Sequence, residues 1–587
     1  MGKAGFCLVG GGAFVIAAVI SCMTACGSSS SGNGFDSTDG GDQGEAGNGE
    51  GGILLGDGGT EGDGSVVGDP KDCDDAKTSK SYVGCDYWPT VTANPAWSIF
   101  DYAVVVSNVG TSPANVTVTG GAVDFPDGGA VDGGSPTVSA TVAPGALQKI
   151  YLPWVPALKA GDADNCLNPP TVQHSVVVPG GAYHLVSSSP VIVYQFNALE
   201  YKGQGGPPGK SWAGCPGDTT CAAASKMYGC FSFSNDAALL LPSTAMTPNY
   251  RITGHAGDGA SDPTNTFFSV TATQDATTVT ATLGAGSSVV DSADGTTIPA
   301  SSGAGTLTFP LAHAGDVAEI FGVAGPTADF SGSLVQGDKP IQVISGVTAL
   351  LVPSNIGAAD HTEQTVLPIE TLGKEYVIPM PDAPGGGPGL GVVRFYGNAD
   401  GTTLTYNGSP PAGCPTALNS GDVVECSIGS VSAGTITSQD IDVTGDKSFA
   451  VALFQEGGDA YKNTSATAGE GDPAETVIAS VEQFRLKYLF LAPTDYDESY
   501  ADIVGEPDAA PVVDDAPVSA TFAPIGSGPY GVWRVTLGAG PRSDGAHTLT
   551  STKPVGLQVV GYGQYTSYQY PGGLNLNQIT APPPAPR

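Results

Sequence analysis

Basic residues are scarce in this sequence. Its 587 residues include 21 Lys and Arg against 57 Asp and Glu, which gives a formal net charge of −36 at pH 7. A surface of this charge repels nucleic acid, and no basic stripe interrupts it. It also repels an anionic bilayer, so attachment to a membrane would require a covalent or hydrophobic anchor. The charge therefore excludes nucleic acid from the expected partners.

Helical periodicity is also rare. Charged residues make up 13% of the chain, and few stretches combine helix-forming residues with a 3.6-residue apolar period. Short runs of Val, Thr, Ile, Tyr and Phe alternate instead with clusters of Gly, Pro, Asp and Asn, and there are 85 Gly in all. Such alternation is typical of strands and turns. It predicts an all-β fold, in a chain long enough for several domains.

Motifs for catalysis are missing as well. The sequence contains no G-x-S-x-G, H-E-x-x-H or P-loop motif. Its G-x-G-x-x-G, from Gly526 to Gly531, is followed by a strand-like run where a dinucleotide-binding motif requires a helix, so we interpret it as a glycine-rich turn. The absence of C-x-x-C argues against zinc-ribbon and thioredoxin-like sites. We therefore expect no enzymatic activity, no cofactor and no metal.

The first 25 residues have the features of an export signal. Lys3 precedes a 15-residue apolar stretch from Phe6 to Ile20, which is short for a transmembrane helix. The following Met23-Thr24-Ala25-Cys26 resembles a bacterial lipobox, which implies cleavage before Cys26 and lipidation of that residue. The alternative is an ordinary cleavable signal in which Cys26 has no role. Residues 26–72 form a Gly- and Asp-rich acidic linker that we expect to be disordered.

Eight cysteines remain after the signal and Cys26. An even number in an exported chain predicts disulfides. The spacing favours three local pairs and leaves two cysteines over for a fourth, although sequence alone does not fix the connectivity. The local pairs are Cys73–Cys85, Cys215–Cys221 and Cys414–Cys426, and the remaining two are Cys166 and Cys230.

A short phrase recurs four times and divides the chain into modules. Its anchor residues are spaced by 150, 108 and 106 positions, and apolar residues stand five before, one after and three after each anchor. We interpret the phrase as a hairpin of two strands around a polar turn. The anchors are Pro190, Pro340, Ser448 and Pro554, and the residues five positions earlier are Leu185, Val335, Val443 and Leu549.

Modules of this length suit β-sandwiches better than propeller blades, which use about 40–50 residues. We therefore predict tandem β-sandwich-like modules, four related repeats in all, between a linker and a Pro-rich tail that we expect to be unpacked. The predicted segments are the signal at 1–25, the linker at 26–72, modules at 73–234, 235–359, 360–474 and 475–576, and the tail at 577–587.

Two features are candidates for recognition or chemistry. The Gly/Pro-rich insertion from Tyr201 to Tyr228 is either a displayed binding loop or a structural insertion. His361, with Asp360 and Glu363, is the one cluster that has the residue types of a metal or acid–base site. For this cluster we favour a hydrogen-bonded corner at a module junction.

Two further runs have alternative interpretations. An acidic stretch either binds calcium or forms a solvated loop. A tyrosine-rich run near the end of the chain either forms an exposed binding surface or packs into the last module. The acidic residues are Asp495, Asp497, Glu498 and Asp502, and the tyrosines are Tyr562, Tyr565, Tyr568 and Tyr570.

Several ordered phrases together resemble one known family. The region from about Cys73 to Leu576 is similar to the IgGFc-binding protein N-terminal domain family, as it occurs in bacterial lipoproteins of the myxobacterial kind. The family takes its name from a mucosal protein that binds the Fc part of immunoglobulin G, and no Fc-contacting residue can be carried over to this chain. The phrases are Tyr82–Pro89, Trp97–Val104, Tyr194–Asn197, Ser232–Ala237, Leu240–Pro242, Asp360–Gln364 and Gly561–Gly563.

The sequence thus predicts a non-enzymatic lipoprotein of the cell envelope, held at the outer membrane or cell surface through the lipid on Cys26. Its IgGFc-binding-like modules would bind a protein or glycan partner and no nucleic acid. Two alternatives stay open. One is an exported carbohydrate-active enzyme or other hydrolase that uses Asp and Glu side chains, and the other is a purely structural envelope component.

Overall fold

The computed structural model describes residues 69–121, 137–163, 170–217, 229–259, 263–464 and 469–584. The predicted signal, Cys26 and the linker up to residue 68 lie outside these ranges, as do Cys166 and Cys221. Strands predominate in the described ranges, which confirms the all-β prediction. No helix in them has the length and apolar character needed to span a membrane. The helical segments are α1 (Cys73–Ser79), α2 (Pro156–Lys159), η2 (Ile369–Thr371), η3 (Gly458–Tyr461) and η4 (Val481–Gln483).

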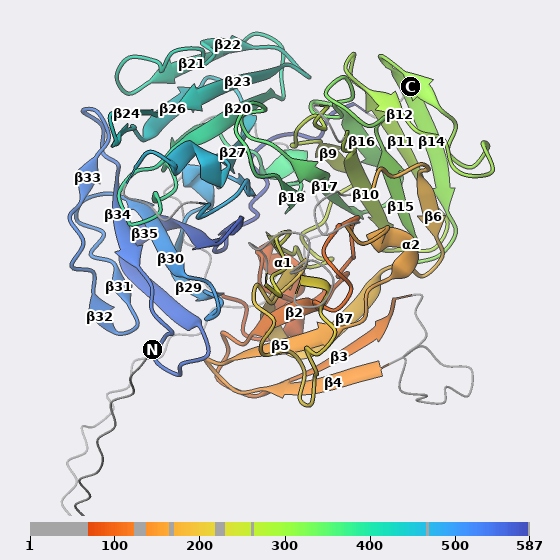
Figure 1. Cartoon of the computed structure of the whole chain (residues 1–587), viewed down its shortest axis with the longest axis horizontal. Coiled ribbons are helices and arrows are strands. Elements are labelled where there is room, and N and C mark those ends of the chain that lie inside the picture. The colour runs from red at the N-terminus through yellow and green to blue at the C-terminus, as the bar shows by residue number, and fades with distance from the viewer. Residues whose placement is uncertain are drawn as a thin grey trace, which may run out of the picture. The chain divides into compact units, whose positions relative to one another are not determined.

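Four β-sandwich modules make up the described chain from residue 69 onward, as predicted (Figure 1). Module 1 contains β1 (Gly84–Tyr87), β2 (Tyr102–Ser107), β3 (Ala114–Gly120), β4 (Thr137–Val142), β5 (Leu147–Leu152), β7 (Tyr183–Phe196) and β8 (Ala237–Leu239). Module 2 contains β6 (Val176–Val178), β9 (Asn249–Arg251), β10 (Thr266–Ala272), β11 (Thr277–Leu283), β12 (Ser288–Val289), β13 (Ser301–Ser302), β14 (Gly305–Leu311), β15 (Val317–Phe321), β16 (Leu334–Gly337), β17 (Ile341–Leu350) and β18 (Asp360–Thr365).

The other two modules are built in the same way. Module 3 contains β19 (Glu375–Ile378), β20 (Gly391–Gly397), β21 (Thr402–Tyr406), β22 (Ala417–Leu418), β23 (Val423–Ile428), β24 (Ser430–Ser432), β25 (Thr435–Thr437), β26 (Ile441–Gly445), β27 (Phe449–Gln455) and β28 (Glu475–Val477). Module 4 contains β29 (Arg485–Leu491), β30 (Glu498–Gly505), β31 (Val512–Val513), β32 (Ala516–Pro517), β33 (Ala523–Pro524), β34 (Gly531–Thr536), β35 (Ala546–Gly563) and β36 (Thr566–Pro571).

The same strand order recurs in every module. In module 2 one sheet has the order β14-β11-β16-β9 and the other β18-β17-β10-β15-β6. In module 3 the corresponding sheets are β22-β21-β26-β19 and β28-β27-β20-β23. In modules 1 and 4 a single long strand, β7 or β35, runs through both sheets, so that its first half pairs with one set of neighbours and its second half with another.

The recurrent phrase crosses from one sheet to the other, and our hairpin interpretation was wrong. Strand β16 pairs with β11 whereas β17, directly after the anchor Pro340, pairs with β10 in the opposite sheet. Val335 and Ile341 nevertheless lie in the same core, because both sheets bury their inner faces against each other. Apolar alternation identifies the strands but not their partners, which explains the error.

A buried tyrosine accompanies every crossing and was missed in the sequence. Each of the four lies in an edge strand, β1, β9, β19 or β29, opposite the apolar residue five positions before the anchor. Its hydroxyl donates a hydrogen bond to the carbonyl of the residue after the anchor, so it fixes the crossing to that strand. The donor–acceptor pairs are Tyr87 to Val191, Tyr250 to Ile341, Tyr376 to Phe449, and Tyr488 to Val555.

Four short strands, β8, β18, β28 and β36, pack together where the modules meet. Gln364 on β18 joins them, since its amide nitrogen lies 2.8 Å from the carbonyl oxygen of Ala237, 2.8 Å from that of Glu475 and 3.1 Å from that of Gln569. By hydrogen bonding, β8, β18 and β28 belong to the preceding modules. The module boundaries therefore lie after these strands, rather than before them at 235, 360 and 475.

Candidate functional sites

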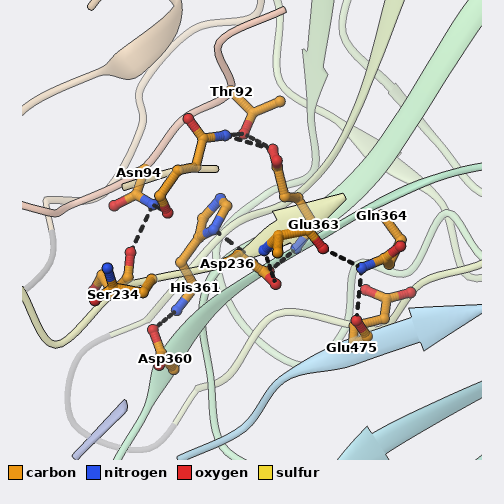
Figure 2. A network of polar contacts seen from close by, with 12 residues as sticks. Thr92, Asn94, Ser234, Asp236, Asp360, His361, Glu363, Gln364 and Glu475 are labelled. Atoms are coloured by element: carbon orange, nitrogen blue, oxygen red, sulfur yellow. Dashed lines mark hydrogen bonds and ion pairs between the residues drawn. The ribbon is translucent and has the colours of Figure 1, made fainter. Parts of the chain in front are cut away.

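Carboxylates and amides gather around β18 at this junction (Figure 2). Glu363 accepts hydrogen bonds from Thr92 Oγ1 at 2.5 Å, Asn197 Nδ2 at 2.6 Å and, through its other oxygen, Gln195 Nε2 at 2.9 Å. The backbone N–H of Glu363 in turn donates to the carboxylate of Asp236. Segments far apart in the sequence thus share one polar network, which we call the central cluster.

Burial controls protonation in the central cluster. It raises the pKa of Glu363 to about 7, and the three donors around this carboxylate limit the rise. Burial also lowers the pKa of His361 to about 3, so the imidazole is neutral at physiological pH. For five other carboxyls, burial raises the pKa well above the ordinary value: Asp236, Glu319, Asp360, Asp472 and Glu475.

The predicted trio at 360, 361 and 363 occupies this corner. Asp360 accepts from the backbone N–H of His361 at 2.7 Å and from Thr566 Oγ1 at 3.0 Å, and all three members of the trio are fully buried. Among the described residues, no group of three or more His, Cys, Asp or Glu is arranged to hold a metal ion. The contacts are those of a hydrogen-bonded corner between modules, the interpretation that we favoured.

The acidic stretch is divided among separate partners. Asp495 accepts from the backbone N–H groups of Tyr201 and Lys202, at 2.8 and 3.3 Å, and Asp497 pairs with Lys202 Nζ at 2.6 Å. Glu498 accepts from the N–H of Gly385 at 2.7 Å. Asp502 is fully buried, beside Arg534. These contacts use the carboxylates to join modules 1, 3 and 4 and do not form either a calcium loop or a solvated loop.

The tyrosine-rich run belongs to the core. Tyr562, Tyr568 and Tyr570 are buried, and the rings of Tyr194 and Tyr570 lie 5.0 Å apart across modules 1 and 4. The packed alternative is therefore the correct one for these three tyrosines. Gly526 to Gly531 forms the turn between β33 and β34, as predicted.

Three disulfides are formed within the described residues. Cys73–Cys85 and Cys414–Cys426 agree with our predictions. Cys215 pairs with Cys230 and not with Cys221, which also corrects the expected Cys166–Cys230 bond. Proximity in sequence favoured the shorter loop, but the folded insertion brings Cys230 within 5.8 Å of Cys215 between Cα atoms.

The described part of the insertion packs against its own module. Lys210 forms an ion pair with Asp101, and its ammonium lies 4.1 Å from the centre of the Trp212 ring. Burial and the adjacent carboxylate of Asp101 raise the pKa of Glu200, at the base of the insertion, to about 8. Residues 218–228 lie outside the described ranges, so the rest of the predicted loop is not placed.

Hydrogen bonds hold the Pro-rich tail against the modules as far as residue 584, which we did not expect, although most of its side chains are exposed. The N–H groups of Ile579 and Thr580 donate to the carbonyl of Glu370, at 2.7 and 3.0 Å. Farther along, Gln336 Nε2 donates to the carbonyl of Pro584 at 3.0 Å. A tail without an apolar pattern gave no indication of these backbone contacts with modules 2 and 3.

A groove of about 380 Å³ lies between modules 3 and 4, and we call it the 3–4 groove. Asn407 spans it, with Nδ2 3.1 Å from Asp442 Oδ2 and 3.4 Å from the carbonyl oxygen of Ile525. Asp440 lies at one side of the groove, and its Oδ1 accepts a hydrogen bond from Arg534 Nη2 at 2.6 Å. The remaining polar side chains include Ser409, Ser438 and Gln439.

The 3–4 groove could not be found from the sequence, because its walls come from two modules whose packing no local pattern records. Its composition suits a ligand with several hydroxyl or amide groups, since carboxylate, amide and hydroxyl groups supply both acceptors and donors. Burial raises the pKa of Asp442 above its ordinary value.

The fold defines a class of protein. It is an all-β protein of four related sandwich modules, which contain disulfides and meet through polar contacts. The model of the IgGFc-binding protein family matches residues 236–561, more than half of the chain, and the chain belongs to that family. The resemblance noted in the sequence is confirmed at this level.

Other comparisons add little. A solved structure of a tetra-tandem repeat from the extending region of a large adhesion protein aligns with 84% of this chain and 99% of its own, at 11% identity and a TM-score of 0.09. Similarity at that level supports no conclusion about fold or function. The search of curated proteins gave no match.

Proposed function

We propose that this chain is an exported, non-enzymatic binding protein of the cell envelope, anchored through Cys26 at the outer membrane or cell surface. Membership of the IgGFc-binding family supports a binding role. The disulfides support an oxidising compartment outside the cytoplasm. The acidic charge of the chain fits a lipid anchor better than electrostatic adsorption to a membrane.

The 3–4 groove is the observation that carries the proposal. It has the volume of a small-ligand site and offers acceptors and donors beside the apolar side chains of Pro411 and Ile525. By contrast, Asp236 and Asp360, whose pKa values burial raises, are fully buried in the central cluster, where they contact other modules. The accessible polar groups of the 3–4 groove therefore suit recognition of a ligand between two modules, with a glycan or a protein loop as that ligand.

Binding can be measured by surface plasmon resonance with the purified full chain. The probes are an array of neutral oligosaccharides and the Fc fragment of immunoglobulin G. We expect saturable binding of one probe, weakened about 5-fold by Gln439→Ala, because a neutral hydrogen bond contributes about 1 kcal/mol. Gln274→Ala, which alters an exposed glutamine in module 2, is the matched control. Absence of saturable binding to both kinds of probe would count against the proposal and favour a structural envelope role.

A hydrolase that uses Asp440 and Asp442 is the second candidate. The observation in its favour is that two carboxyls share the groove and burial raises the pKa of Asp442, as an acid catalyst requires. Its test is release of reducing ends from the same oligosaccharides, by the wild type and by Asp442→Asn. Turnover that disappears in this variant would establish the hydrolase, and no turnover by the wild type would exclude it for those substrates.

A further inference from the structure

A second cavity, of about 430 Å³, lies between modules 2 and 3 beside the tail, and we call it the 2–3 cavity. Its lining contains three basic residues, Arg251, Lys374 and Lys447, and one acidic residue, Asp446. The lining of the cavity is therefore positive, whereas the whole chain is negative, with 57 acidic and 21 basic residues. A positive cavity in a strongly negative protein concentrates anionic ligands locally.

Arg251 distinguishes this cavity. The residue is 6% exposed, and no carboxylate among the described residues lies within 4 Å of its guanidinium. Its Nη1 donates to the carbonyl of Gly332 at 2.7 Å and its Nη2 to Ser420 Oγ at 2.9 Å, whereas Nε has no partner among the described residues. Burial lowers the pKa of Arg251, and the carboxylate of Asp400, which lies beyond ion-pair distance, opposes this effect. A buried cation without a counter-ion in direct contact costs folding free energy.

The other arginines that are mostly buried each have a carboxylate within ion-pair distance. Arg394 pairs with Asp329 at 2.9 Å, Arg534 pairs with Asp440 at 2.6 Å, and Arg485 pairs with Asp69. Arg251 is thus the exception among the buried arginines of the described chain. The lack of a carboxylate in direct contact with its guanidinium points to an anionic group that comes from outside the chain.

The walls of the 2–3 cavity indicate the kind of molecule that carries the anion. Leu334, Ile369 and Pro583 provide apolar surface, while Asn398 and Ser448 provide amide and hydroxyl groups. Lys374 and Lys447 are exposed at the rim, where a ligand enters. An apolar face combined with hydroxyl-binding groups suits a pyranose ring, and a planar guanidinium suits a carboxylate.

We propose that the 2–3 cavity binds an acidic sugar, with the carboxylate of a uronic acid residue directed towards Arg251 and the two lysines. The tail forms one wall of this site, held by the bond from Gln336 to Pro584 and by the bond from Thr580 Oγ1 to the carbonyl of Leu372 at 3.1 Å. The site extends the proposed binding function to a second seam and shares no lining residue with the 3–4 groove.

Isothermal titration of the full chain with glucuronate tests the proposal, with glucose as the neutral comparison and N-acetylglutamate as the peptide-like carboxylate. We expect glucuronate to bind at millimolar or tighter affinity, with an affinity that falls as salt is added. Glucose should bind at least 10-fold more weakly, since a charge-assisted hydrogen bond contributes about 1.5–3 kcal/mol. Saturation by glucose at the same concentration, or tighter binding of N-acetylglutamate, would overturn the assignment to an acidic sugar.

Single substitutions distinguish binding in the 2–3 cavity from nonspecific attraction of an anion to basic residues elsewhere on the protein. Lys374→Gln and Lys447→Gln change exposed side chains, so the fold should survive, and each should weaken glucuronate binding about 2- to 5-fold. Arg251→Gln should weaken it on the order of 10- to 100-fold. Lys462→Gln removes an exposed lysine of module 3 outside the cavity and should leave the affinity unchanged. Equal effects of the Lys374 and Lys462 changes, or no saturable binding of glucuronate to the wild type, would refute the proposed site.

Discussion

Stability should fall as the pH rises from 7 to 9, because the central cluster holds carboxyls that stay protonated only in the fold. Burial raises the pKa of Glu319, Asp360 and Glu475 well above the ordinary values, whereas the unfolded chain ionises these groups near pH 4. At any pH between the ordinary pKa of such a group and its raised pKa in the fold, the folded state binds more protons than the unfolded state. Each such group lowers the free energy of unfolding by about 1.4 kcal/mol per pH unit until its folded pKa is passed.

The choice of pH window follows from two other groups. The pKa of Glu363 is raised to about 7, so its contribution, about 3 kcal/mol, is lost mainly between pH 4.5 and 7. The pKa of His361 is lowered to about 3, so this residue has the opposite effect, and its contribution is complete above about pH 6.5. The two effects oppose each other between pH 5 and 7 but contribute little change between pH 7 and 9.

The variant Glu319→Gln tests whether the fall in unfolding free energy with pH comes from the carboxyls of the central cluster. One carboxylate oxygen of Glu319 accepts from the N–H of Ala93 at 3.0 Å, and glutamine can keep this bond, while the other oxygen has no partner among the described residues. The variant should reduce the slope of unfolding free energy against pH by up to about 1.4 kcal/mol per unit. Any cost of burying the amide shifts the curve without changing its slope.

The assay is urea denaturation of the full chain, followed by tryptophan fluorescence, at half-unit steps from pH 7 to 9. Asp515→Asn, at an exposed position, removes an equal formal charge and should leave the slope nearly unchanged. A free energy of unfolding that stays constant or increases towards pH 9 would refute the reasoning. So would equal slopes for the wild type and Glu319→Gln.

Three more outcomes are expected. Cys26→Ala should release the protein from membranes, whereas Cys22→Ala should not; retention of both would contradict the lipid anchor. Tyr250→Phe should lower the free energy of unfolding by about 1–3 kcal/mol, because the buried carbonyl of Ile341 loses its donor at 2.6 Å; a change below about 0.3 kcal/mol would show that the crossing does not depend on it. Peptide mapping should recover Cys215 linked to Cys230, and a Cys166–Cys230 peptide would disprove that pairing.

Local patterns in the sequence predicted much of the fold. The alternation of β-forming residues with turn residues identified most strands, and the anchors identified four modules, since side chains facing a sandwich core recur at every second position. The same alternation could not show that Val335 and Ile341 belong to strands in opposite sheets, because a strand pattern records burial and not its partner. The tyrosines of the crossings lie about 70 to 105 positions from their acceptors, so no local motif links them.

The candidate sites were harder to predict from the sequence, because the role of each residue depends on whether its side chain is buried. A run with Tyr562 and Tyr568 fits either a surface or a core until its neighbours are known, and both side chains are buried. His361 beside two carboxyls has the composition of an active site, yet its surroundings make it a neutral residue at a junction. Arg251 belongs to no sequence motif, and it becomes a candidate only because it is buried with no carboxylate within 4 Å of its guanidinium.

The sequence by itself determined the all-β class, the four repeats, the acidic charge and the family, because composition, periodicity and ordered phrases are properties of the chain. The tertiary structure decided which strands share a sheet, where each carboxylate is desolvated and where the seams leave cavities. Those properties arise when segments far apart in sequence are brought together, and the free energy of a buried charge depends on the groups that then surround it. The proposed binding sites lie at such seams, where only the packing of the modules creates them.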